Sequence, residues 1–259
     1  MLQGRHSWRG PIGMFVFQDN PSSENRDLAG VLRELERVLP DRSDIDRPGF
    51  RERYREALHA FAFNSPTIGR LSALLDGASY FVGGDEHRIV QVREKQEDRV
   101  YKLTHSDSFG CRSEFHPSDP ELLGKHFFAG VNTDLLFYLE RWICLNSIST
   151  YQTRFEGFLP PESEHHMPRV CISQPVLPPQ TLTRPNPTEL EIEEAFLPYG
   201  FRRISEGAFL HDESRILLTD AAPRNVRIVT GVPVPFDAIA EVASQEVINW
   251  ANSGTGFKR

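Results

Sequence analysis

Three oxygen-bearing side chains in the C-terminal part of the chain have the types and spacing of a metal-binding set. Asp220 follows the apolar residues Leu217 and Leu218, Asn225 comes five positions after Asp220, and Asp237 comes twelve positions after Asn225. Mg²⁺ prefers oxygen ligands, which carboxylates and amides supply. The pattern therefore predicts a divalent-cation site, although each acid taken alone is more often a turn residue or a helix cap.

Two upstream features are suited to binding phosphate. Gly83 and Gly84 lie in a turn between two strand-like runs, where a glycine pair lets backbone N–H groups approach an anion. Lys102 lies on the next strand-like run, where its ammonium group could hold phosphate oxygens as a point charge. Each feature alone is a weak signal, because most glycine pairs between strands form plain hairpin turns and most strand lysines face solvent.

The hydrophobic pattern indicates the elements that must position these residues. Apolar residues recur at steps of three and four in three N-terminal stretches, which predicts helices over 28–38, 50–63 and 66–75. Strand-like runs follow at 79–82, 87–92 and 99–104, then a polar loop at 105–120, a helix at 134–145 and two strands at 155–158 and 170–173. The first three strands predict an antiparallel meander.

The second half of the chain begins with a proline-rich connector at 174–187, which is the best candidate for an internal lobe boundary. Thr188 and Glu191 form a capping box, which predicts a helix that ends near Gly200. Two hairpins are expected after it, over 208–218 and 225–234.

The ordered set of a glycine turn, a strand lysine, Asp-x4-Asn and a later strand-terminal aspartate resembles the protein-kinase fold. The resemblance is closest to the compact, divergent kinase-like domain of large polyvalent proteins from phages and mobile elements, and it covers about residues 79–242. The stretches that carry it are 83–87, 100–104, 138–146, 173–175, 220–225 and 235–239.

The resemblance implies an α+β, two-lobed minimal protein-kinase-like fold with an antiparallel N-lobe sheet, one helix and a reduced C-lobe, preceded by a helical N-terminal segment. The implied division is a flexible arm (1–26), the helical segment (27–78), an N-lobe with its hinge (79–175) and a reduced C-lobe with the catalytic and metal-binding loops (176–259).

The resemblance also implies site roles. Asp220 and Lys102 would be catalytic, Asp220 as the base for the acceptor hydroxyl and Lys102 on the α- and β-phosphates of ATP. Asn225 and Asp237 would hold Mg²⁺. The remaining nucleotide-binding residues would be Gly83 and Gly84 over the phosphates, Ser173 and Gln174 at the adenine hinge, Arg224 against phosphate charge, and Glu140 as the acidic partner of Lys102, with Glu121 as the second choice.

The sequence departs from the kinase pattern in several places, among them the nucleotide loop, where His87 stands in place of a third glycine, and the region after Asp237, where no A-P-E motif follows. Leu218-Thr219-Asp220 stands where His-Arg-Asp is usual, Ala238 follows Asp237 in place of glycine, and 22 residues remain after Asp237. The helical platform that docks protein substrates is therefore not expected downstream. Three hypotheses stay open: an ATP- and Mg²⁺-dependent phosphotransferase, a nucleotide-binding pseudokinase without turnover, and a non-catalytic interaction domain.

Composition limits the partners. With 39% hydrophobic and 25% charged residues the chain reads as globular, and its net charge of −7 argues against a nucleic-acid or membrane-surface binder. The cysteines Cys111, Cys144 and Cys171 are widely spaced, and no long apolar run exists, so we expect a cytoplasmic protein. The expected partners are a nucleotide and an acceptor that the sequence does not reveal, a protein hydroxyl or a small molecule. The pair His165-His166 is expected to be exposed, not a metal site.

Overall fold

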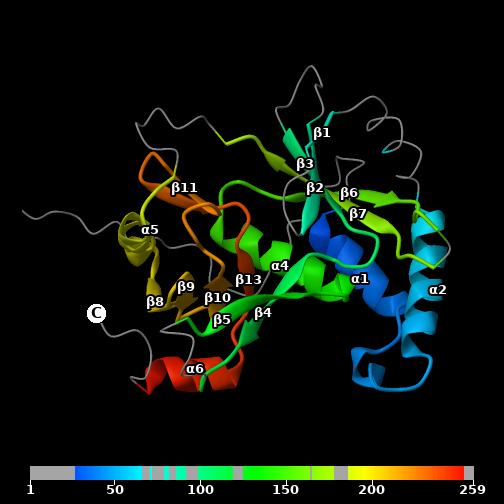
Figure 1. The fold of residues 1–259 in the computed structure, drawn as a ribbon, viewed down its shortest axis with the longest axis horizontal. Coiled ribbons are helices and arrows are strands. Elements are labelled where there is room, and N and C mark those ends of the chain that lie inside the picture. The colour runs from blue at the N-terminus through cyan, green and yellow to red at the C-terminus, as the bar shows by residue number, and fades with distance from the viewer. Residues whose placement is uncertain are drawn as a thin grey trace, which may run out of the picture.

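The computed structural model describes residues 27–65, 71, 79–81, 86–91, 99–118, 125–163, 165–177 and 186–253. The chain forms a mixed α+β structure, in which one antiparallel sheet lies above a central helix and a second antiparallel sheet lies beside it (Figure 1). No helix in these ranges is both long enough and apolar enough to cross a membrane.

The first sheet has five strands, and all its neighbouring strands are antiparallel. Its order is β1 (Ser79–Phe81), β2 (His87–Gln91), β3 (Arg99–Thr104), β7 (Arg169–Pro175) and β6 (Arg154–Leu159). The expected meander over the first three strands is confirmed. Side chains of β3 alternate between the two faces. Tyr101 and Leu103 pack in a small cluster with Val90 and Cys171, so Lys102 points to the opposite face, toward the central helix.

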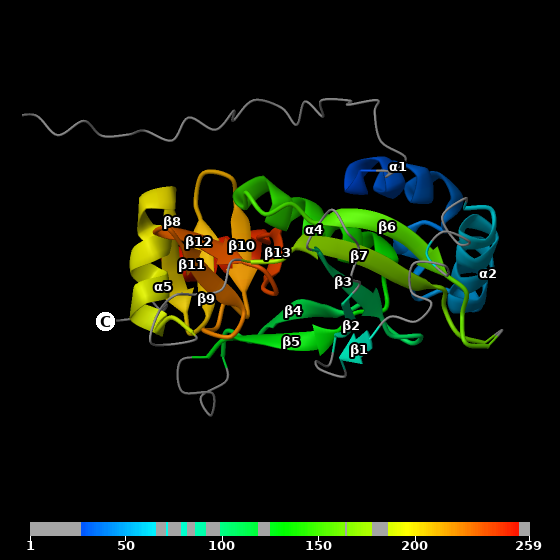
Figure 2. The same cartoon turned by 90° about the horizontal axis from the view of Figure 1, so that it is seen from above.

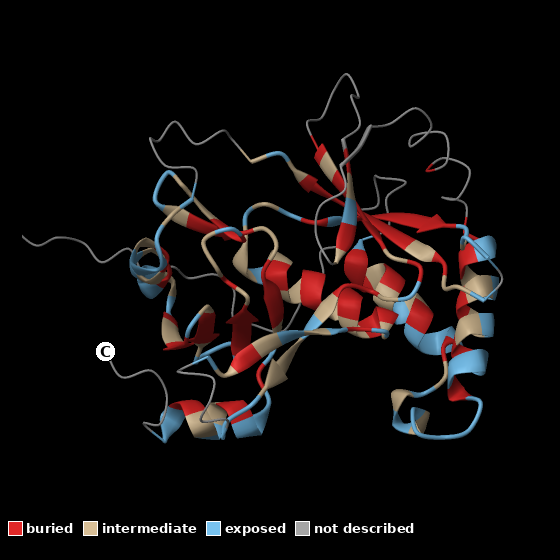
Figure 3. Cartoon of the chain, viewed as in Figure 1, coloured by how far each residue is buried: buried red, intermediate tan, exposed pale blue. Residues whose placement is uncertain are grey.

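The central helix α4 (Leu135–Ile148) runs beneath this sheet and is buried along most of its length (Figures 1 and 3). The side chain of Asp134 accepts a hydrogen bond from the Leu136 amide and so caps its N-terminus. Two further helices, α1 (Leu28–Val38) and α2 (Phe50–Phe63), lie beside α4 and the end of the sheet (Figures 1 and 2). All three helices were predicted; of the expected helix over 66–75, only Leu71 is described.

The second half is built mainly from strands. A four-stranded antiparallel sheet has the order β13 (Ile239–Val242), β10 (Ile216–Thr219), β9 (Ala208–His211) and β8 (Phe201–Ser205). A separate hairpin joins β11 (Val226–Val229) to β12 (Val232–Pro235). Helix α5 (Glu189–Phe196) precedes them, with the predicted capping box of Thr188 and Glu191, and α6 (Gln245–Asn252) follows them. Short 3₁₀ turns occur at Arg42–Asp44 and Leu197–Tyr199.

One apolar core connects both halves. It includes Leu35 of α1, Trp142 of α4 and Ile172 of β7, and it continues to Phe209 and Leu218 of the second sheet. The second sheet therefore packs against the same helix that carries the first sheet, and loops from both halves can meet above α4.

The expectation of a polar loop over 105–120 was wrong. Residues Cys111–Phe115 form β4, which pairs with β5 (Phe127–Val131) in an antiparallel ribbon. Most of the β4 side chains are only half-buried, so the strand lacks the apolar alternation that marks a strand in a sequence. Strands β8 and β13 and helix α6 were likewise not foreseen.

Candidate functional site

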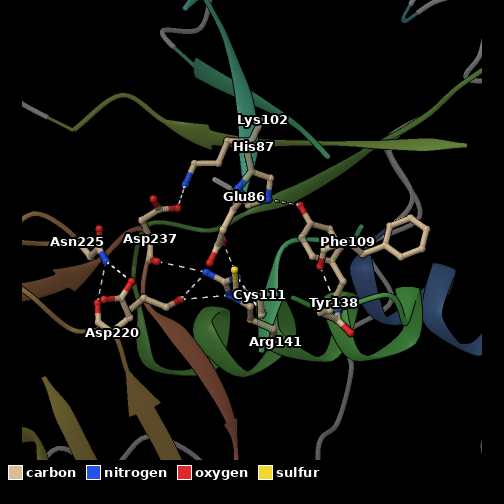
Figure 4. A network of polar contacts seen from close by, with 12 residues as sticks. Glu86, His87, Lys102, Phe109, Cys111, Tyr138, Arg141, Asp220, Asn225 and Asp237 are labelled. Atoms are coloured by element: carbon tan, nitrogen blue, oxygen red, sulfur yellow. Dashed lines mark hydrogen bonds and ion pairs between the residues drawn. The ribbon is translucent and has the colours of Figure 1, made fainter. Parts of the chain in front are cut away.

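A cavity of about 210 Å³ lies where the first sheet, the β4–β5 ribbon and two loops of the second half meet. Five of the predicted site residues line it: Lys102, Asp220, Arg224, Asn225 and Asp237. Three residues to which the sequence analysis gave no site role, Glu86, His87 and Cys111, lie beside them. Figure 4 shows the polar contacts among most of these side chains.

Lys102 and Asp237 form a close ion pair across the cavity. The Nζ atom of Lys102 lies 2.6 Å from Oδ1 of Asp237, donates to the Phe236 carbonyl at 3.1 Å and lies over the Trp142 ring, 5.3 Å from its centre. The Lys102 side chain is only 5% exposed. Burial by itself raises the pKa of Asp237, but the Lys102 ammonium more than offsets this effect, and the pKa falls to about 2. Asp237 is therefore ionised at neutral pH.

Asp220 directly follows β10 in a left-handed backbone conformation, with φ of 48°. Such a conformation is unfavourable for a residue other than glycine, and contacts from the next turn hold it. The Asn225 amide donates to the Asp220 carbonyl at 2.8 Å and to its Oδ2 at 2.7 Å, and Arg224 donates to Oδ1 at 3.0 Å. Burial raises the pKa of Asp220.

Asn225 also connects the two loops that carry the acids. Its backbone carbonyl accepts hydrogen bonds from the amides of Phe236 and Asp237, at 3.1 and 3.4 Å. Its side-chain amide is oriented by Asp220, so its side-chain oxygen is free to face the cavity. Neither that oxygen nor Oδ2 of Asp237 receives a hydrogen bond from any described residue. These two hard oxygen donors fit a cation such as Mg²⁺.

Helix α4 adds two contacts that the sequence did not predict. Tyr138 places its hydroxyl 3.0 Å from Nε2 of His87, and Arg141 donates to Oε2 of Glu86 at 2.7 Å. Burial lowers the pKa of His87 well below its usual value, so the ring is neutral. One sequence signal could have pointed here, because Arg141 is a charged residue within an otherwise apolar helical face.

A second group of metal-ligand types also lies in the cavity. Ligand atoms of Glu86, His87 and Asp237 all lie within 4.8 Å of one another. However, the two members that are particular to this group are already engaged: Glu86 is ion-paired with Arg141, and Nε2 of His87 lies 3.0 Å from the Tyr138 hydroxyl. Asn225 is therefore a better partner for Asp237 in holding a divalent cation than Glu86 or His87.

Glu140 is not the partner of Lys102, and this expectation was wrong. The Glu140 carboxylate accepts from Nη1 of Arg42 at 3.1 and 3.2 Å, outside the cavity. Adjacent residues of an α-helix point about 100° apart, so when Arg141 points toward Glu86 and the Asp237–Ala238 backbone, Glu140 points toward the Arg42 turn. Glu121, the second choice, lies outside the described residues.

Ser173 and Gln174 do not reach the cavity either. Both lie within β7, where Ser173 is paired with Tyr101 of β3 on one side and with Arg154 of β6 on the other. The side chains are buried and engaged: Arg99 donates to Ser173 Oγ at 2.8 Å, and Gln174 donates to Thr153 at 3.0 Å. The expectation that these two residues form an adenine-binding hinge was therefore wrong, because their backbone lies within the sheet and their side chains are hydrogen-bonded to other residues.

Two other expectations concern the glycine pair Gly83-Gly84 and the histidine pair His165-His166. Gly83 and Gly84 lie outside the described residues. His166 contacts Ser163 through its ring and accepts a bond from His59 at its carbonyl, which agrees with a surface turn.

Comparisons with protein-family models, with curated proteins and with solved structures found no match for this chain. What the site can do must therefore be argued from its own geometry and charges.

Proposed function

We propose that the protein is an ATP- and Mg²⁺-dependent phosphotransferase with a minimal kinase-like arrangement of its site. The observation that carries this proposal is the convergence of Lys102, Asp220, Asn225 and Asp237 on one cavity, from segments up to 135 positions apart in the chain. Phosphoryl transfer depends mainly on positioning and electrostatic stabilisation, so a small scaffold with these groups is sufficient.

In this proposal, different residues of the cavity bind the phosphates, hold the cation and accept the proton. Lys102 binds phosphate oxygens, and Arg224, with a side chain that is 72% exposed, adds positive charge at the mouth of the cavity. Asn225 and Asp237 hold Mg²⁺, which when bound neutralises negative charge on the phosphates. Asp220 accepts the proton of the acceptor hydroxyl, and its raised pKa makes it a better base than an ordinary aspartate.

The cavity volume fits the phosphate end of a nucleotide. Pockets that enclose a whole drug-sized ligand measure roughly 300–1,000 Å³, whereas this cavity measures about 210 Å³. We therefore assign it to the phosphates, the cation and the acceptor hydroxyl, and not to adenine.

A second candidate function is nucleotide binding without turnover. One observation favours it: both carboxylate oxygens of Asp220 already receive hydrogen bonds, from Arg224 and Asn225. The Arg224 contact favours the ionised carboxylate and so opposes its uptake of a proton. The third hypothesis is a non-catalytic interaction domain, and no contact of the cavity residues favours it.

Transfer of label from γ-labelled ATP, combined with thermal unfolding, separates these functions. The phosphotransferase predicts label on a protein or small-molecule acceptor, with loss of transfer but not of ATP stabilisation in Asp220→Ala. A binder without turnover predicts stabilisation alone, and an interaction domain predicts neither. Glu140→Gln, a change on the same helix but outside the cavity, serves as the control. Transfer that survives in Asp220→Ala would refute the proposed base.

A further inference from the structure

Arg141 is a fully buried cation at the centre of the site. Its side chain is 0% exposed, although it lies in the middle of α4 and faces the loops of both halves. Besides Glu86, its guanidinium donates to the backbone carbonyls of Cys111 at 3.3 Å, Asp237 at 3.2 Å and Ala238 at 3.1 Å (Figure 4). One side chain thus contacts the start of β2, the start of β4 and the segment that carries Asp237.

The geometry of the guanidinium makes these contacts interdependent. Burying a cation is unfavourable unless it is paired and hydrogen-bonded, and here Glu86 and the carbonyls provide both. The group is a rigid planar fork. Nη1 binds Glu86 and Cys111 while Nη2 binds Asp237 and Ala238, so the two sides cannot shift independently.

Arg141 also reaches the other site residues through the backbone. The amides of Phe236 and Asp237 donate to Asn225, whose side chain in turn holds Asp220. One turn earlier on α4, Tyr138 holds His87, the neighbour of Glu86. The helix therefore fixes the end of the cavity nearest β2 and the end that would bind the cation.

We infer that Arg141 is a positioning residue that sets the metal-binding segment, residues 236–238, relative to Glu86. From the sequence, helix α4 was expected to supply an acidic residue, Glu140, as the partner of Lys102 on β3. Here the helix supplies the cation, and the acid comes from the residue before β2. This inference rests on the proposed function in so far as it concerns metal and nucleotide.

The first test is a Mg²⁺ titration of nucleotide binding, with a fluorescent ATP analogue as probe. Removing a group that orients a metal ligand typically weakens metal affinity by about 10–100-fold. Arg141→Met should therefore raise the Mg²⁺ concentration at half-saturation by about that factor, and should change Mg²⁺-free nucleotide affinity by less than about twofold. Arg141→Lys should recover part of the effect, and Glu140→Gln should behave as wild type. Equal losses with and without Mg²⁺ in Arg141→Met would overturn the inference.

The second test needs no ligand. Hydrogen exchange of the free protein should be at least about tenfold faster at the amides of Phe236 and Asp237 in Arg141→Met, with β3 unchanged. The double variant Arg141→Met/Glu86→Gln removes both charges, so it separates loss of positioning from unfolding caused by an unpaired Glu86. Unchanged exchange at 236–237 in both variants would refute the positioning role. If wild type binds no nucleotide, the proposed function fails, whereas this measurement still decides the role of Arg141.

Discussion

The ion pair between Lys102 and Asp237 makes a quantitative prediction for Lys102→Met, a change that keeps an apolar stem over Trp142. The pKa of Asp237 is lowered from 3.8 to about 2, and each pKa unit corresponds to about 1.4 kcal/mol. This gives about 2.5 kcal/mol of stabilisation. Because the Asp237 side chain is 37% exposed, screening by solvent reduces the figure to about 1–2 kcal/mol.

The sign of the pH dependence follows from the direction of the shift. A carboxyl whose pKa is lower in the folded than in the unfolded protein stabilises fully above its unfolded value, here 3.8, and loses this contribution as the pH falls through about 2. Lys102→Met should thus lower the free energy of unfolding by about 1–2 kcal/mol at pH 7. Below pH 4, the difference in the free energy of unfolding between Lys102→Met and wild type should become smaller.

Urea denaturation at pH 7 and at pH 3 measures this difference. In an Asp237→Asn background, the same substitution should be neutral or stabilising, because Lys102 is then a buried cation without a carboxylate. Lys125→Met, an exposed change outside the cavity, should shift stability by no more than about 0.5 kcal/mol. The reasoning is refuted if Lys102→Met costs the same in both backgrounds or at both pH values.

Three further outcomes follow from individual contacts. Thr188→Ala removes the capping box of α5 and should lower the free energy of unfolding by about 1 kcal/mol in urea denaturation; a Thr188→Asn change should largely restore it. Burial raises the pKa of Glu241 to about 7, so its neutral form stabilises the fold below about pH 4.5 and this contribution is lost as the pH rises through 7. Glu241→Gln should therefore be more stable than wild type at pH 8, by up to about 2 kcal/mol, and nearly equal at pH 4; equal free energies of unfolding at pH 8 would contradict this. Arg42→Ala breaks partly exposed ion pairs with Glu140 and Asp134, so it should cost about 1 kcal/mol and leave ATP stabilisation unchanged in thermal unfolding.

Much of the fold could be predicted because the local patterns and the tertiary structure agree. The run around Lys102 contains β-branched and aromatic residues and follows a polar stretch of sequence, so its strand was evident. Thr188 and Glu191 predicted the start of α5, because a capping box is a local interaction that does not depend on tertiary contacts. The spacing of Asp220, Asn225 and Asp237 likewise carried over to three dimensions, since each lies at or near the end of an apolar strand.

The features that could not be predicted depend on contacts between distant segments. Nothing local distinguishes Glu140 from Arg141, and only the packing of α4 decides which of them contacts Glu86 at the cavity wall. Strand β4 forms because β5 pairs with it, not because its own residues alternate. The sequence similarly could not show that the backbone of Ser173 is paired with a strand on each side, because the order of strands in a sheet depends on tertiary structure.

The measurement that tests the central claim most directly is ATP binding by calorimetry, with and without Mg²⁺, to wild type, Lys102→Met and Asp237→Asn. We predict that wild type binds ATP more tightly with Mg²⁺, that Asp237→Asn loses this Mg²⁺ dependence, and that Lys102→Met weakens binding in both conditions. Each lost charge-assisted contact should reduce affinity by about 10-fold or more. ATP binding that is absent in wild type, or equal in all three proteins, would contradict the assignment of this cavity to a nucleotide and its cation.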